Sequence, residues 1–475
     1  MQRFSVSRFL WLSVHVKNFK VCNLHFTTNS SAEKYYGVLQ KNPKNVERTL
    51  VTVKAKLDSN CVNEVLRRCL PGQSQMAIRF FIWAGLQSSY RHSPFTYNKV
   101  CELFKVKQNP RIVIDVVEAY REESCVVSVK TMKMILNLCE KAKLANEALW
   151  VLRKMPEFNL RPDTIMYNIV IRLFCVRGDM VMADKLMKEM GLISLYPDII
   201  TNVLMIKGYC NAGRLEDACG LFKAMRRYGC VTNSVAYSAL LDGICRSGSM
   251  ERALELLGEM EKEGGDCRPN VVTYTSVIQS FCEKGMMVEA LGLLDRMNAC
   301  GCAPNRVTVS TLIKGLCGEG NVNEAYKLID KVIAGGSVSS GDCYSSLVVE
   351  LVRTNRLGDA EKLFSEMLVS GVKPDGLACS IIFKELILWG KVLDVFRLYE
   401  EIENIGFLSS IDSDIYSILL LGLCQESHSV EAVKLARFML EKGIRLQAPY
   451  VGKIVEHLKK FQDKELLDIV DHGLC

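Results

Sequence analysis

The stretch that decides the fold runs from Thr164 to Asp198 and reads TIMYNIVIRLFCVRGDMVMADKLMKEMGLISLYPD. In its first half, apolar residues recur at positions i, i+3, i+4 and i+7, which makes one stripe on a helix; they are Tyr167, Val170, Ile171 and Phe174. Gly178 interrupts this pattern, and Pro197 stops the second stripe that follows. The second stripe consists of Met180, Ala183, Leu186, Met187 and Met190. The stretch therefore predicts two helices joined by a short turn.

Copies of this pattern occupy most of the chain at a spacing of about 35 residues, and such a period indicates a repeat architecture. The segments from Ser234 and Val271 repeat both stripes, with Gly248 and Gly285 at the turn. Counted outward, units begin at Pro94, Val129, Thr164, Ile199, Ser234, Val271, Arg306, Gly341, Gly376 and Ser413, and the last complete unit ends at Gln447. Two units have 37 residues, with the extra pair in the closing loops around Gly265 and Ser410.

A single helical hairpin cannot bury both of its apolar stripes, so neighbouring hairpins must stack and share one core. We therefore predict an all-α fold, a right-handed superhelical α-solenoid of tandem helix-turn-helix repeats of about 35 residues, with a long concave surface. Ten tandem repeats span residues 94–447. Residues 33–93 form an N-terminal region with a degenerate repeat at 59–93, and residues 448–475 begin a further repeat that caps the stack.

Composition narrows the function classes. The 475 residues are 49% hydrophobic, which argues against disorder, and no apolar run approaches the roughly eighteen residues of a membrane span. Twenty cysteines include no Cys-x-x-Cys pair. The cysteines that recur on apolar helix faces are expected to be buried free thiols; they are Cys175, Cys210, Cys245, Cys282 and Cys317. Cys300 and Cys302 are close, but no histidine lies near them in sequence, so we predict neither a metal site nor a cofactor.

Residues 1–32 have the composition of an organellar transit peptide. They carry Arg3, Arg8, Lys17 and Lys20 with no acidic residue, together with large apolar side chains. A mitochondrial address fits best, and a chloroplast address or an unstructured cytosolic tail is the alternative. Without this segment the chain has 56 basic and 53 acidic residues, a net charge of only +3, so any nucleic-acid binding must rest on base contacts more than on bulk charge.

Three segments resemble the pentatricopeptide repeat family of plant organelles: VVTYTSVI from Val271, GRLEDA from Gly213 and GVKPD from Gly371. The resemblance covers residues 94–447, and the spacing of 35 is that of the P subclass. It implies binding of single-stranded organellar RNA, with one base read by each repeat. It also implies a role in RNA processing, stabilisation, splicing or translation, with other RNA-processing proteins as candidate partners.

In that family the fifth and last residues of a repeat select the base, and an aliphatic residue near the start wedges beside it; Phe95, at this place in the repeat from Pro94, departs from this in being aromatic. The resemblance implies the selecting pairs Asn98 with Ser128, Asn168 with Asp198, Ser238 with Asn270, Thr275 with Asn305, and Ser345 with Asp375. It implies the wedges Phe95, Ile165, Val235, Val272 and Val307. The family's rules assign these pairs, in order, cytosine, uracil, adenine, adenine and guanine. On sequence chemistry alone, each of these polar residues is also an ordinary first-turn or helix-capping residue.

Some repeats depart from the family's pattern. Lys133 and Val203 occupy selecting positions, and Asp342 and Asp414 replace wedges, where an acid is expected to repel a phosphate backbone. No catalytic motif is present: the histidines are isolated, and neither a zinc-deaminase signature nor a phosphate-binding glycine loop occurs. We therefore expect an RNA-binding protein that is not an enzyme. A protein-binding scaffold similar to tetratricopeptide arrays is the alternative, favoured by the near-neutral charge.

Overall fold

The computed structural model describes residues 30–41, 44–69, 71–227, 232–461 and 464–470, so most of the predicted address at 1–32 lies outside the described residues. The described residues form helices joined by turns, with no strand among them. They divide into two units, and the boundary in the chain lies between Tyr196 and Pro197. None of the described helices combines the length and the apolar character needed to cross a membrane.

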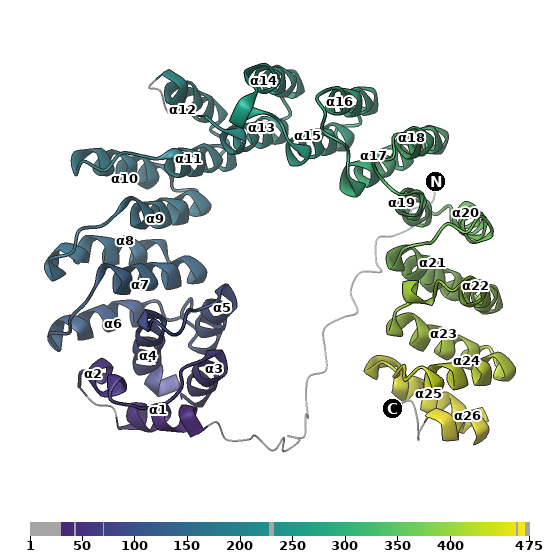
Figure 1. Cartoon of the computed structure of the whole chain (residues 1–475), viewed down its shortest axis with the longest axis horizontal. Coiled ribbons are helices and arrows are strands. Elements are labelled where there is room, and N and C mark those ends of the chain that lie inside the picture. The colour runs from purple at the N-terminus through teal and green to yellow at the C-terminus, as the bar shows by residue number, and fades with distance from the viewer. Residues whose placement is uncertain (1–29, 42–43, 70, 228–231, 462–463, 471–475) are drawn as a thin grey trace, which may run out of the picture. The chain divides into compact units, whose positions relative to one another are not determined.

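The first unit is a series of helices followed by regular helix pairs (Figure 1). Its elements are α1 (Ser30–Gln40), α2 (Val46–Val51), α3 (Ser59–Arg68), η1 (Pro71–Gln73), α4 (Ser74–Leu86), α5 (Pro94–Leu103), α6 (Arg111–Glu122), α7 (Val129–Ala142), α8 (Ala145–Lys154), η2 (Met155–Phe158), α9 (Thr164–Arg177) and α10 (Met180–Leu192).

The second unit consists of helix pairs throughout. Its elements are α11 (Ile199–Asn211), α12 (Leu215–Arg227), α13 (Ser234–Ser247), α14 (Met250–Glu263), η3 (Gly265–Cys267), α15 (Val271–Glu283), α16 (Met287–Ala299), α17 (Arg306–Gly318), α18 (Val322–Ala334), α19 (Ser340–Arg353), α20 (Leu357–Val369), α21 (Gly376–Leu388), α22 (Val392–Ile405), η4 (Leu408–Ser410), α23 (Ser413–Gln425), α24 (Ser429–Glu441), α25 (Ala448–Phe461) and α26 (Lys464–Ile469).

Within the second unit, the first helix of each pair packs on the first helix of the next pair as well as on its own partner. These first helices follow one another along one side of the unit, and the second helices follow along the other (Figure 1). The prediction of an all-α fold made of tandem helix pairs is confirmed. The right-handed sense of the superhelix stays a prediction.

Helix starts in both units coincide with polar capping residues, whose side chains accept an otherwise unpaired backbone N–H of the first turn. Asp163 caps α9 in this way, and Asn233 caps α13. Glycine in the left-handed conformation ends both helices, Gly178 at φ 83° and Gly248 at φ 84°. The one shift from the expected starts is α19, which begins at Ser340 rather than Gly341 because Ser339 supplies its cap. The two extra-residue loops contain the short turns η3 and η4.

The repeated cysteines set the spacing between neighbouring first helices. A side chain placed on Gly243 of α13 would come within 2.1 Å of the Cys210 sulfur of α11, and one on Gly315 of α17 within 3.1 Å of the Cys282 sulfur of α15. The cysteine at the twelfth position of one first helix thus packs against the glycine at the tenth position of the neighbouring first helix. Cys210 and Cys282 remain half-buried, so the prediction of full burial is too strong for them. Burial raises the pKa of the Cys210 thiol to about 11, which leaves it protonated at neutral pH.

The N-terminal region is joined to the repeats by a buried arginine. Arg79 of α4 is 1% exposed and donates hydrogen bonds to Glu47 of α2 and Glu123 after α6, at 2.6 to 2.9 Å. Its guanidinium also lies 5.3 Å from the centre of the Tyr120 ring. Glu47, Glu123 and Cys125 have ligand atoms within 4.8 Å of one another, but the arginine already binds both carboxylates. This cluster holds α2, α4 and α6 together.

Candidate functional site

A row of exposed apolar side chains marks the second position of the first helices. The five predicted wedges, Phe95, Ile165, Val235, Val272 and Val307, are between 52% and 70% exposed. Ile200 and Leu377 occupy the same position and are each 52% exposed, although we had not predicted them. Both could have been predicted from the sequence, because each is the second residue of its repeat, as the five predicted wedges are. An isolated exposed valine needs no explanation, but the same exposure at one position in successive repeats points to a shared use.

The fifth residues of the repeats differ in accessibility. Asn98 is exposed, and Ser238 and Thr275 are half-buried. Asn168 is only 4% exposed and Ser345 is completely buried, so neither presents a free polar surface. Val203 is also buried, which fits its poor match to a selecting position. Only some of the predicted fifth residues are therefore placed to touch a ligand directly.

Each predicted last residue is the N-cap of the following first helix. The side-chain oxygens accept the backbone N–H three residues on, at 2.7 to 3.2 Å; they belong to Ser128, Asp198, Asn270, Asn305 and Asp375. The capping role that sequence chemistry suggested is thus present in every case. It uses one acceptor oxygen and leaves the rest of an amide or carboxylate for other partners.

In two successive repeats a threonine hydroxyl links the fifth residue to the last. The Ser238 and Thr273 hydroxyl oxygens lie 3.0 Å apart, and Thr273 in turn donates to Asn270 Oδ1 at 3.2 Å. The Thr275 and Thr308 hydroxyls are 2.7 Å apart, and Thr308 donates to Asn305 Oδ1 at 3.0 Å. The Oδ1 atom of each asparagine therefore accepts two hydrogen bonds, one from a backbone N–H and one from a threonine hydroxyl. The Nδ2 groups of Asn270 and Asn305 have no hydrogen-bond partner among the described residues.

The bridging threonine is a site residue that we missed. It is the third residue of the first helix, and it recurs as Thr96, Thr131, Thr201, Thr273 and Thr308. Each of these side chains is buried, at 5% exposure or less. The recurrence at the repeat spacing was visible in the sequence, but only the structure shows that the hydroxyl orients a neighbouring asparagine.

The other predicted pairs are arranged differently. Ser128 shares a hydrogen bond with Thr131 at 2.9 Å, and no contact joins it to Asn98 among the described interactions. Asn168 lies in the first unit and Asp198 in the second. Asp375 is joined to Ser345 through its backbone, because the Asp375 N–H donates to the buried Ser345 hydroxyl at 3.0 Å.

Each of the two acidic residues that replace wedges forms an ion pair with a lysine or arginine of the preceding repeat. Lys384 lies 2.7 Å from the Asp414 carboxylate, which raises the pKa of the lysine. Arg306 lies 3.1 Å from Asp342. The repulsion expected between these acids and a phosphate backbone is therefore partly compensated by neighbouring positive charge.

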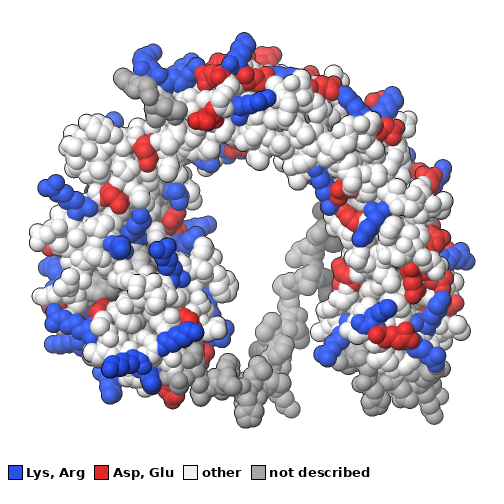
Figure 2. Space-filling model, in the orientation of Figure 1, with Lys and Arg blue, Asp and Glu red and all other residues white. Residues whose placement is uncertain are grey.

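Both rows of helices in the second unit carry paired charges. On the second helices many cations pair with an acid of the neighbouring repeat, as in Arg252 with Glu216 and Lys331 with Asp295. Figure 2 shows blue and red side chains interspersed over these helices. Exposed lysines with no ion pair among the described residues also occur on both rows: Lys207 and Lys314 on first helices, and Lys223 and Lys262 on second helices. Lys207 and Lys314 are the ninth residues of α11 and α17, on the same helix face as the second and fifth positions.

We call the second, fifth and ninth positions of the first helices, with the capping residues beside them, the first-helix face. It presents an exposed apolar side chain at the second position in both units, and in the second unit it also presents two hydroxyl-linked polar pairs and two exposed lysines. This arrangement suits an extended ligand with a regular repeat. Nothing in it assembles a nucleophile, base and activating group.

Comparison with known families identifies the repeat. A model of the PPR repeat family matches residues 197–246 and 269–318, and a model of the single PPR repeat matches residues 165–192, 235–265, 307–337, 342–372 and 414–444. The chain contains pentatricopeptide repeats. The matched PPR repeats include those that carry Asp342 and Asp414, so these acids lie within recognisable members of the array.

Curated relatives with PPR repeats come from Arabidopsis thaliana. Pentatricopeptide repeat-containing protein At5g47360 is 53% identical over 189 residues, which are 40% of this chain and 40% of that protein. Pentatricopeptide repeat-containing protein At1g52640, mitochondrial, is 30% identical over 124 residues, 26% of this chain and 24% of that protein. The matched segments thus span two fifths or less of these relatives.

Solved structures similar to this chain include the pentatricopeptide repeat protein PPR10 from maize. It is 18% identical, with a TM-score of 0.43, over 91% of this chain and 72% of that one. The complex of PPR10 with an 18-nt psaJ RNA element is 17% identical, with a TM-score of 0.33, over 93% of this chain and 84% of that one.

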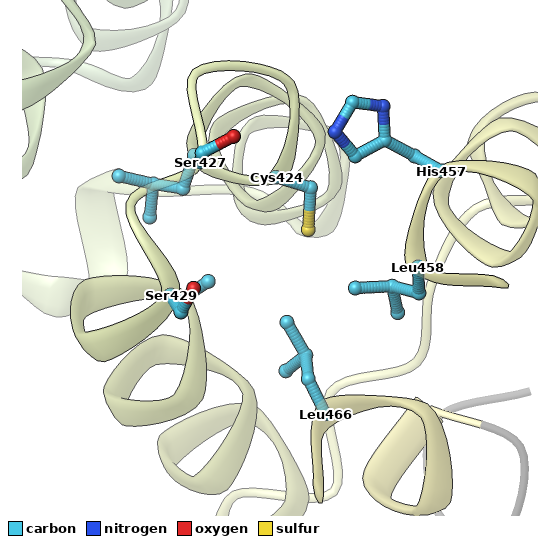
Figure 3. A pocket seen from close by; sticks show the side chains of 8 residues that line it. Cys424, Ser427, Ser429, His457, Leu458 and Leu466 are labelled. Carbon is cyan, nitrogen blue, oxygen red and sulfur yellow. The ribbon is translucent and has the colours of Figure 1, made fainter. Parts of the chain in front are cut away.

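The last matched PPR repeat packs against the C-terminal helices α25 and α26, with a cavity of about 280 Å³ between them. Figure 3 shows Cys424, His457, Leu458 and Leu466 around this cavity. It belongs to the packing of the terminal helices on the array and is separate from the first-helix face.

Proposed function

We propose that this chain binds single-stranded RNA along its first-helix face and selects individual bases, one per repeat, without catalysis of its own. PPR repeats as a class read one base each through two or three side chains. The observation that carries the proposal is the hydroxyl-linked pair of polar residues that occurs twice in succession, Ser238 with Asn270 and Thr275 with Asn305. Each pair lies beside an exposed valine of the same repeat.

The orientation of these two asparagines favours particular bases. Because Oδ1 already accepts two hydrogen bonds, Asn270 and Asn305 offer Nδ2 as a donor. A donor suits the ring-nitrogen acceptor of adenine or cytosine and does not suit the ring N–H of uracil or guanine. This chemistry agrees with adenine at both repeats, which is what the family's rules imply.

The charge distribution also supports RNA binding despite the small net charge. Lys207 and Lys314 are available to phosphates beside the apolar row, because no acid pairs with them among the described residues. These two lysines would supply the electrostatic attraction at the first-helix face. Affinity should depend only weakly on salt, because few phosphates are neutralised.

We further propose an organellar role in transcript processing, stabilisation, splicing or translation, with the chain acting by occupying its RNA. Several relatives are named as mitochondrial, which supports mitochondria over chloroplasts. The 35-residue spacing supports the P subclass, and other RNA-processing proteins are candidate partners.

The test is selection of binders from a randomised single-stranded RNA pool at fixed salt, beside the same pool annealed to its complement. We expect enrichment of a motif that contains two adjacent adenines, from the single strand only. Replacing Lys207 and Lys314 by glutamine should reduce the slope of log affinity against log salt by about 0.7 for each phosphate that the protein no longer neutralises.

The matched control replaces Lys223 and Lys262, exposed lysines of the second helices α12 and α14, by glutamine. This control should leave the salt slope unchanged. If no RNA is enriched, the proposal is wrong, and the exposed apolar row together with the near-neutral charge would then favour a protein-binding scaffold.

A further inference from the structure

A single arginine, Arg306, links the starts of three first helices of the second unit, α17, α19 and α21. Arg306 is the first residue of α17, and its guanidinium lies 3.1 Å from the carboxylate of Asp342, in the first turn of α19. The same guanidinium donates a hydrogen bond to Oδ2 of Asp375, the N-cap of α21. Asp375 is 69 residues away in the chain, so this interaction reaches over one whole repeat.

Both oxygens of the Asp375 carboxylate already accept a hydrogen bond within the protein, and the side chain is only 19% exposed. Oδ1 accepts the backbone N–H of Ala378 at 2.7 Å as the helix cap, and Oδ2 is held by Arg306. The asparagines of the two reading repeats differ, because Asn270 and Asn305 keep Nδ2 available. A base with a ring N–H would therefore have to compete with the Arg306 guanidinium for the Asp375 carboxylate.

The rest of this repeat is equally unsuited to reading a base. Its fifth residue, Ser345, has no exposed surface and already accepts the Asp375 N–H. Its second position carries Asp342 in place of an apolar wedge, and the carboxylate is tied to Arg306. Selector and wedge are thus both occupied by interactions within the protein.

We propose that Arg306 closes the Ser345–Asp375 repeat to base recognition, so that this repeat spaces the RNA without reading it. The inference rests on the proposed RNA binding and replaces the guanine that the family's rules assign here. Arg306 is thus a specificity-determining residue, because its ion pair keeps the Asp375 carboxylate from contacting a base. Asp375 would read uracil or guanine if Arg306 were absent, because a carboxylate only accepts hydrogen bonds.

The test compares RNA selections by the full chain and by four variants, aligned on the adjacent adenines of the Ser238 and Thr275 repeats. The first variant is Arg306→Gln, and the second adds Asp342→Val to restore an apolar wedge. The control is Arg252→Gln, which breaks an ion pair between second helices at a similarly exposed arginine; the side chains of Arg252 and Arg306 are 42% and 48% exposed. Circular dichroism checks that helix content is retained.

We expect the full chain and the Arg252→Gln control to show no base preference at the Ser345–Asp375 position. Arg306→Gln should gain a preference of about fivefold for uracil or guanine there, the size of one direct base contact, and the double variant should gain more. Adding Asp375→Asn to Arg306→Gln should abolish the gain.

Two results would overturn the inference while the adjacent adenines are still enriched. One is a guanine preference already present in the full chain, which would mean that RNA displaces Arg306. The other is an unchanged selection in Arg306→Gln, which would mean that the repeat is closed for a different reason. Loss of the adjacent adenines in the full chain would instead refute the proposed RNA reading, and this inference with it.

Discussion

Replacing Arg79 by methionine should destabilise the N-terminal helices strongly, because it leaves two carboxylates facing each other. The arginine is 1% exposed, and its partners Glu47 and Glu123 have side chains that are 22% and 19% exposed. Their ligand atoms lie within 4.8 Å, which corresponds to about 3 kcal/mol of repulsion at an effective dielectric constant of about 20. Removing one partner from a buried pair costs about 3 to 5 kcal/mol, so we expect a loss near the lower end of that range.

Hydrogen exchange measured by mass spectrometry is the suitable assay, because it reports the opening free energy of α4 and α6 separately from the rest of the chain. Peptides from α15, in the second unit, serve as the internal control. Adding Glu47→Gln and Glu123→Gln to Arg79→Met should recover most of the loss, since the uncompensated charges are then gone. A loss below about 1 kcal/mol in Arg79→Met, or no recovery in the triple variant, would refute the account of this cluster.

The same substitution should reverse the response of the cluster to acid. In the unsubstituted chain the hydrogen bond from Arg79 lowers the pKa of Glu123, so its stabilisation is present above the unfolded pKa and is lost as pH falls through the folded pKa. In Arg79→Met the two carboxylates repel each other, because the cation between them is gone. Protonation relieves this repulsion, so protection of α4 should rise as pH falls.

Three further predictions concern packing, pH and the first-helix face. Gly243→Ala places a side chain 2.1 Å from the Cys210 sulfur, so we expect a loss of about 1 to 3 kcal/mol in urea unfolding, and adding Cys210→Ala should recover part of it. Burial lowers the pKa of His92 to about 4, so the unfolded chain takes up the proton first. Neutral His92 therefore contributes about 1 to 3 kcal/mol to the free energy of unfolding, after a discount for partial exposure. This contribution is present above a pH of about 6.5 and is lost as the pH falls towards 4. The thermal stability of His92→Gln should lack this pH dependence. Val272→Asp should weaken RNA binding in a filter assay by about tenfold, because it removes apolar packing against a base and adds a negative charge, while Val288→Asp, at an 82% exposed position on α16, should not.

Most of the fold could be predicted because its signals are local and repeated. Capping residues such as Asn233 and turn glycines such as Gly178 mark helix ends within a few residues of sequence. The apolar stripes mark the buried faces, and the period reveals which helices are neighbours. The shifted start of α19 shows the limit, since the repeat spacing predicts a start at Gly341, whereas the Ser339 side chain caps the helix one residue earlier.

The candidate site was less predictable because it depends on how closely neighbouring repeats approach. Asn168 and Ser238 occupy the same repeat position, yet the first is 4% exposed and the second is half-buried. The pairing of Arg306 with Asp375 spans 69 residues and has no local pattern that would announce it. The selecting roles of the predicted pairs stay predictions, and the structure adds the capping and hydroxyl contacts that orient them.

Recoding one repeat tests the central claim, repeat-by-repeat reading of RNA, most directly. We would change Thr275→Asn and Asn305→Asp in the full chain and repeat the selection from a randomised single-stranded pool at the same salt. Aspartate should still cap α17, as Asp198 caps α11 and Asp375 caps α21, so the helix is preserved. We expect one of the two adjacent adenines to become uracil, with a preference of about 1 to 3 kcal/mol. An unchanged motif, or a loss of all selectivity with the fold intact, would contradict the claim.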